Sequence, residues 1–283
     1  MDVIYTIIET ILPFEFLKYD FMKNAFLAVL IITPLFAILG TMTVSNNMAF
    51  FSDALGHSAL TGIALGIALG INNDIICMIA FGIFLALLIA KVKRANTASS
   101  DTIISVFSSL SIAVGLIILS KGGSFAKYST YLIGDILSVD KIEIIYILIL
   151  FVVLFVIWSF IFNKLLIVSI NFQLAKSRSI KAFLYENIFI ILVALTVMLS
   201  IKWVGMLVIN SLLILPAAAS RNISRNTKQY FFISIFISLF SGIGGLIFSY
   251  YFDTSAGASM SVIAALMFFV TYLMRQIFGL RRG

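Results

Sequence analysis

Nine apolar stretches, each close to the length of a membrane-spanning helix, follow one another along the 283-residue chain. A transmembrane helix needs about 20 consecutive apolar residues, and fewer where it is buried inside a bundle. The sequence therefore predicts an all-α polytopic membrane protein with about nine transmembrane helices, or alternatively eight. The stretches cover residues 22–44, 54–70, 75–91, 102–120, 142–163, 187–202, 204–219, 230–251 and 257–277.

The composition excludes a soluble domain. Hydrophobic residues make up 62% of the chain and charged residues 11%, whereas soluble domains carry about 45–50% and about 25%. The same numbers exclude a disordered chain and a nucleic-acid binder that uses a basic patch. We expect an interfacial segment over residues 1–20, a single transmembrane domain over 21–279 and a basic tail over 280–283.

The lysines and arginines predict the orientation. If the N-terminus lies outside and the C-terminus inside, 13 of the 19 basic residues lie on the inner side, as cytoplasmic loops of membrane proteins require. The connection over residues 121–141 is then extracytoplasmic. The connections over 92–101, 164–186 and 220–229 are cytoplasmic, and the spacing of 164–186 suits an interfacial helix.

The stretch over residues 54–70 is short and rich in glycine, alanine and serine. Small residues four positions apart allow helix backbones to approach closely. We therefore expect this helix inside the bundle rather than against lipid.

Asp53 and the single histidine, His57, lie four residues apart at the start of that helix. Residues with this spacing share one helix face, and ionisable residues near the membrane interior often line an ion path. The alternative is structural, with Asp53 as the helix N-cap and His57 as a hydrogen-bonding residue at the interface. The residues alone leave both interpretations open.

The sequence gives little support for ATP binding, nucleophilic catalysis or copper transport. It has no Walker A pattern, and one histidine and one cysteine, Cys77, give nucleophilic catalysis little to work with. The ten methionines are scattered, which is typical of core filling rather than of a copper path.

Two blocks resemble the zinc/manganese-type ABC importer permeases. The first is MAFFSDALGHSALTGIALG over residues 48–66, and the second is KWVGMLVINSLLILPAAASR over residues 202–221. Weaker blocks follow at residues 101–104, 134–137 and 253–258, so that the resemblance covers about residues 20–275. This chain departs from the family pattern at Ser52, Gly56, Thr61 and Asn210.

The resemblance implies a permease subunit in the bacterial cytoplasmic membrane, with a fold similar to that of the cobalamin-importer permeases but with fewer helices. Its partners would be a second permease copy, ATP-binding subunits, an extracytoplasmic metal-binding protein and membrane lipid, and no nucleic acid. No cofactor would be bound permanently. Asp53 and His57 match the family's positions for metal contact. Oxygen and imidazole ligands suit Zn²⁺, Mn²⁺ and Fe²⁺, of which we favour zinc.

The resemblance also implies a coupling site for the ATPase, at Pro216, Ala217, Ala218, Arg221 and Arg225. We expect a helix break at the proline and both arginines on one face of any helix that continues there. The alternative is an ordinary helix end with positive-inside arginines. In the outer connection, Gly134 and Asp135 form either a contact for the delivering protein or a simple turn.

Two other functions compete with this interpretation. A secondary metal or proton-coupled carrier would use Asp53 and His57 as a proton relay and would need no ATPase. A membrane-embedded enzyme acting on lipid would need a catalytic cluster that the sequence lacks. We therefore expect that the chain is not an enzyme and that ATP is hydrolysed on a separate subunit.

Overall fold

The computed structural model describes residues 5, 15–71, 73–95, 98–122, 130–170 and 172–277. Within these residues the regular secondary structure is entirely helical, which confirms the predicted fold class. The long helices are α2 (Asp20–Ser45), α3 (Phe51–Ala68), α4 (Asp74–Arg94), α5 (Ser100–Gly122), α8 (Lys141–Ile170), α10 (Ala182–Val204), α11 (Met206–Ile223), α12 (Thr227–Phe252) and α13 (Ala256–Ile277). The short ones are η1 (Glu15–Lys18), α7 (Thr130–Ile133), η2 (Ile136–Ser138) and α9 (Phe172–Ser177).

Each of the nine predicted stretches overlaps one of the long helices. Among the described residues, seven of these helices are long and apolar enough to cross a membrane, namely α2, α4, α5, α8, α10, α12 and α13. Helix α11 contributes a shorter apolar segment, Val208–Ile223. Helix α3 carries Asp53 and His57 among its apolar residues.

The chain forms two compact units. The first contains residues 1–41, 134–153 and 211–283, and the second contains residues 42–133 and 154–210. Helices α2, α8 and α11 contribute residues to both units.

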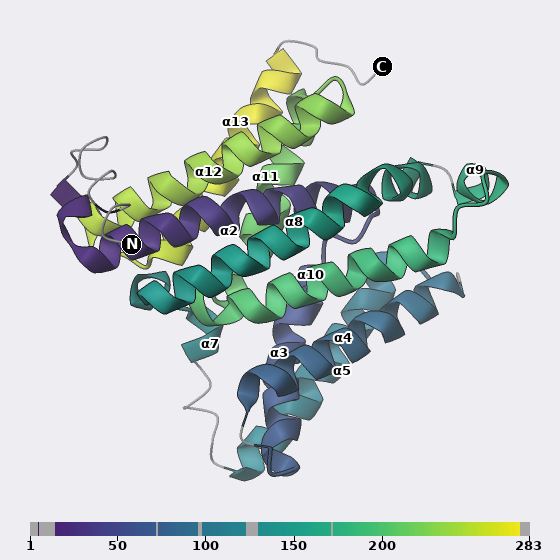
Figure 1. Cartoon of the computed structure of the whole chain (residues 1–283), viewed down its shortest axis with the longest axis horizontal. Coiled ribbons are helices and arrows are strands. Elements are labelled where there is room, and N and C mark those ends of the chain that lie inside the picture. Colours follow the sequence, from purple (N-terminus) through teal and green to yellow (C-terminus); the bar gives the residue numbers. More distant parts are fainter. Residues whose placement is uncertain are drawn as a thin grey trace. The chain divides into compact units, whose positions relative to one another are not determined.

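Helix α3 is the interior helix of the second unit, where it packs against α4, α5 and α10 (Figure 1). From residue 51 to residue 66, every side chain is buried except those of Asp53, His57 and Leu65. Its glycines permit this packing: a Cβ added at Gly62 would lie 2.8 Å from the carbonyl oxygen of Cys77 on α4. The prediction that this helix lies inside the bundle is confirmed.

In the first unit, α12 packs against α2 and α13. The hydroxyl of Ser238 on α12 donates a hydrogen bond of 2.8 Å to the carbonyl oxygen of Thr33 on α2. On the α13 side, a Cβ added at Gly245 would lie 2.5 Å from the backbone of Met260. Helix α12 is therefore fixed by small residues on both of its contact faces.

Two expectations for helix boundaries need correction, and two predicted terminal segments lie wholly or mostly outside the described residues. Helix α8 continues to Ile170 rather than ending near 163, because apolar residues extend it and Leu165 is buried. The helix within the basic connection 164–186 is only the six residues of α9. Of the interfacial segment predicted over 1–20, residues 1–4 and 6–14 lie outside the described residues, as does the basic tail over 280–283.

The two adjacent glycines Gly244 and Gly245 give a matched test of this packing. Gly245→Ala places a methyl group against the backbone of Met260, so we expect it to lower the free energy of unfolding by about 1–3 kcal/mol. Gly244→Ala meets only the flexible end of Ile263, at 3.3 Å, and should change stability by less than about 0.5 kcal/mol. Thermal unfolding in detergent measures both variants. Equal losses of stability would show that α12 and α13 do not approach as described.

Candidate functional site

The site begins at the first turn of α3. The turn before it contains Asn47, whose backbone lies in the left-handed region with φ of 53°, and helix α3 starts at Phe51. The N-cap residue is Phe50, which makes no side-chain capping hydrogen bond. The structural interpretation of Asp53 as the N-cap is therefore wrong. Asp53 lies within the first turn, where the helix dipole favours a negative charge.

Asp53 and His57 lie together on one face of α3. The Nε2 atom of His57 is 3.5 Å from the Oδ1 atom of Asp53, which confirms the prediction that they share a helix face. Their side chains are 25% exposed for His57 and 37% exposed for Asp53, on a helix that is otherwise buried around them. The separation is longer than an ordinary hydrogen bond. A carboxylate oxygen and an imidazole nitrogen therefore lie side by side at an accessible position.

The described part of one chain does not complete a metal site. Among these residues, no group of three or more His, Cys, Asp or Glu side chains could hold a metal ion. Seven of the ten methionines are core residues, as predicted: Met22, Met42, Met48, Met78, Met198, Met206 and Met260. A full coordination shell around Asp53 and His57 would need ligands from elsewhere.

Two contacts hold the start of α3 against the start of α11. The hydroxyl of Ser52 donates a hydrogen bond of 2.7 Å to Oδ1 of Asn210. One turn further along α3, a Cβ added at Gly56 would lie 3.2 Å from Cβ of Met206. In the sequence, Ser52 and Asn210 stand out only as departures from a family pattern, and no local signal predicts their contact.

Thr61 joins α3 to α5. Its buried hydroxyl donates a hydrogen bond to the carbonyl oxygen of Ser111. A Cβ added at Gly115 would lie 2.7 Å from Oγ1 of Thr61, so the two backbones approach closely here. Helix α3 runs without interruption through Thr61, one of the positions where the chain departs from the family pattern. This hydrogen bond holds α3 against α5 four residues after His57.

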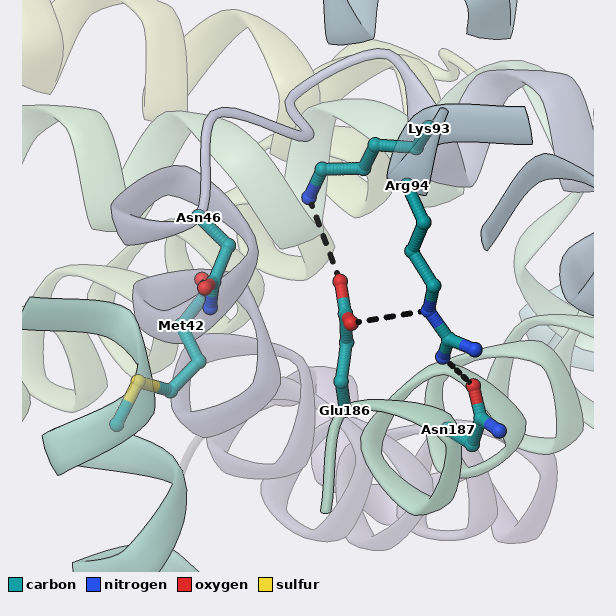
Figure 2. A network of polar contacts seen from close by, with 6 residues as sticks. All are labelled: Met42, Asn46, Lys93, Arg94, Glu186 and Asn187. Atoms are coloured by element: carbon teal, nitrogen blue, oxygen red, sulfur yellow. Dashed lines mark hydrogen bonds and ion pairs between the residues drawn. The ribbon is translucent and has the colours of Figure 1, made fainter. Parts of the chain in front are cut away.

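A polar network that the sequence analysis did not find joins α4 to α10 (Figure 2). Glu186 lies between two cations, with Oε1 at 3.7 Å from Nζ of Lys93 and Oε2 at 3.5 Å from Nε of Arg94. Arg94 also donates a hydrogen bond to Asn187. Lys93 and Glu186, together with residues 45–48 that precede α3, line a cavity of about 220 Å³. The network therefore lies beside the turn that leads into the Asp53 helix.

The predicted coupling segment, residues 216–225, does not have the helix break and the shared arginine face that we expected. Pro216 does not break the helix, because α11 continues through it to Ile223. Arg225 lies beyond the helix end, where its backbone N–H donates to Oε1 of Gln229 at 3.0 Å. Arg221 and Arg225 therefore do not share a helix face. Pro216 and Ala217 are buried, whereas Ala218 and Arg221 are half-buried and Arg225 is exposed.

Gly134 and Asp135 form a turn. Gly134 has φ of 69°, a conformation that glycine adopts without strain. The side chain of Asp135 caps η2 by accepting a hydrogen bond of 3.0 Å from the backbone N–H of Leu137. The turn explains both residues, and their contact with a delivering protein stays a prediction.

The chain is similar to known membrane proteins over most of its length. The model of the ABC 3 transport family matches residues 18–275. The high-affinity zinc uptake system membrane protein ZnuB of Haemophilus influenzae is 32% identical over 259 residues, which cover 91% of this chain and 99% of that protein. The manganese import system permease protein ScaB of Streptococcus gordonii is 28% identical, with coverage of 90% of this chain and 91% of that protein.

A solved structure agrees with these relatives. PsaBC from Streptococcus pneumoniae in complex with Fab shares 26% sequence identity and a TM-score of 0.78, and the match covers 96% of this chain and 95% of that chain. The shared fold thus extends over nearly all of both chains. Since the family model spans most of the sequence and the zinc uptake relative exceeds 30% identity, this chain belongs to the ABC 3 transport family.

Proposed function

We propose that the chain is the transmembrane permease subunit of an ATP-driven importer for divalent transition-metal ions, with zinc favoured over manganese or iron. The relatives that support this proposal are named for zinc uptake and for manganese import. The single observation that carries it is the Asp53–His57 pair, which is partly exposed on a stretch of α3 that is buried around it.

The geometry of the pair suits a transition metal. Ligand atoms about 2.0–2.2 Å from a tetrahedral Zn²⁺ ion lie about 3.4 Å from each other. The 3.5 Å between Nε2 of His57 and Oδ1 of Asp53 is close to that separation. One ion can therefore bind both atoms with little movement of either side chain. Oxygen and imidazole ligands also accept Mn²⁺ and Fe²⁺, so zinc is favoured by the named relatives rather than by the ligands alone.

A second copy of the chain would complete the coordination. One chain contributes one imidazole and one carboxylate, and His57 is its only histidine. Two copies related by a two-fold axis would contribute two of each, which is a four-ligand shell of the kind that Zn²⁺ prefers. The proposed importer therefore contains a permease homodimer with the α3 helices facing the axis.

ATP hydrolysis belongs to a separate subunit. The sequence contains no Walker A pattern, and the chain is a member of a transport family that consists of membrane components. In the proposed orientation the N-terminus is outside and the C-terminus is inside, in the bacterial cytoplasmic membrane. An extracytoplasmic metal-binding protein would deliver the ion, and the coupling segment would contact the ATPase from the inner side.

Removing either member of the pair tests the proposal. We expect His57→Ala and Asp53→Asn to reduce metal uptake at least about a hundredfold, because the first removes a ligand and the second replaces a charged carboxylate with a neutral amide in both copies of the dimer. Uptake of zinc and manganese into proteoliposomes that contain the full complex measures the loss.

A matched control comes from Asp74, which also lies in the first turn of a helix but has no proposed role in the path. Asp74→Asn should transport normally. Normal uptake by His57→Ala, with the protein present in the membrane, would reject the proposed path. Transport by the purified chain without any ATPase subunit would favour a secondary carrier instead.

The coupling segment gives a separate test. We propose that Ala218, Arg221 and Arg225 contact the ATPase, while the buried Pro216 and Ala217 shape the end of α11. Arg221→Lys with Arg225→Lys should lower metal-stimulated ATP hydrolysis about tenfold, because lysine does not reproduce the forked hydrogen bonding of arginine. Arg275→Lys, near the end of α13, keeps the same kind of charge and should have no effect. Equal hydrolysis in all variants would contradict the proposed ATPase contact. Arg221 and Arg225 would then serve only as positive charges on the cytoplasmic side of the membrane.

A further inference from the structure

Ser52 and Asn210 form a side-chain hydrogen bond between helices that are distant in the sequence. The two residues are 158 positions apart, and the distance from Oγ of Ser52 to Oδ1 of Asn210 is 2.7 Å. Ser52 is fully buried and directly precedes Asp53. A part-buried interhelical hydrogen bond thus lies beside the candidate metal pair.

We propose that the Ser52–Asn210 hydrogen bond orients Asp53 and His57 and thereby determines how tightly the path holds its metal ion. Ser52 and Asn210 are positioning residues in this proposal, since they act through Asp53 and His57. The proposal rests on the proposed function of the Asp53–His57 pair.

Helix geometry connects the two pairs. Ser52 and Gly56 are four residues apart and both contact α11, at Asn210 and at Met206. Asp53 and His57 each follow one of these residues, so they form a parallel row about 100° around the same helix. Because α3 is one rigid helix, any rotation that moves the first row away from α11 turns the second row by the same angle. The contact with α11 therefore acts together with the packing on α4, α5 and α10 to set the direction in which the metal pair points.

The hydrogen bond adds directionality that the close packing lacks. At Gly56 the two helices meet through small apolar groups, which allow close approach but tolerate a small rotation or slide. A hydrogen bond is sensitive to both distance and angle. The Ser52–Asn210 hydrogen bond supplies this sensitivity between α3 and α11, and Ser52 is one residue from the carboxylate that the bond would orient.

A double-mutant cycle tests the proposal in the full importer complex in proteoliposomes. Ser52→Ala and Asn210→Ala should each raise the KM for Zn²⁺ by about three- to tenfold, with kcat changed by less than about twofold. The double variant should be no worse than either single variant, because all three lack the same bond. Ser58→Ala is the matched control, since the buried hydroxyl of Ser58 bonds only within α3, to Leu55 at 2.7 Å, and its KM should equal that of the wild type.

Two further variants keep the outcome interpretable. Asn210→Asp retains an acceptor oxygen for Ser52 and should have a KM no higher than the wild type, whether or not Asn210→Ala folds well. A lower melting temperature with unchanged KM, or additive KM effects of Ser52→Ala and Asn210→Ala, would overturn the positioning role. If His57→Ala transports normally, the proposed path itself is wrong. If His57→Ala is inactive while KM is unchanged in the cycle, only the positioning role fails.

Discussion

A carboxylate and an imidazole inside a membrane protein have to be shielded from lipid, because burying a charged group in hydrocarbon is costly. Helix α3 carries both groups, and it packs inside its unit against α4, α5 and α10. That packing depends on glycines, since a Cβ at Gly62 would collide with the backbone of α4. The position of the candidate site therefore follows from the small residues of the helix that bears it.

The polar side chains of α3 fall into two groups, hydroxyl groups that form hydrogen bonds within the protein and the Asp53–His57 pair. On the buried part of α3, hydroxyl groups satisfy their hydrogen bonds either within the helix, as Ser58 does, or with a neighbouring helix, as Ser52 and Thr61 do. Asp53 and His57 stay partly exposed and are 3.5 Å apart. In the proposed dimer, a second copy of the chain would supply the remaining ligands.

Local patterns in the sequence predicted most of the helices and the geometry of the pair. Apolar stretches located all nine long helices, and the four-residue spacing placed Asp53 and His57 on one face. Contacts between segments that are distant in the sequence could not be predicted from such local patterns. Nothing local in the sequence connects Ser52 to Asn210 or Glu186 to Arg94. The helix break predicted at Pro216 was wrong: α11 continues to Ile223, because a proline inside a hydrophobic helix can be accommodated by its neighbours.

The most direct measurement of the central claim is the X-ray absorption spectrum of zinc bound to the purified permease–ATPase complex, prepared without the extracytoplasmic binding protein. His57 is the only imidazole in the chain. The account predicts a nitrogen and oxygen shell at about 2.0–2.2 Å, with imidazole scattering that disappears in His57→Ala. A sulfur shell, or imidazole scattering that is unchanged in His57→Ala, would contradict it.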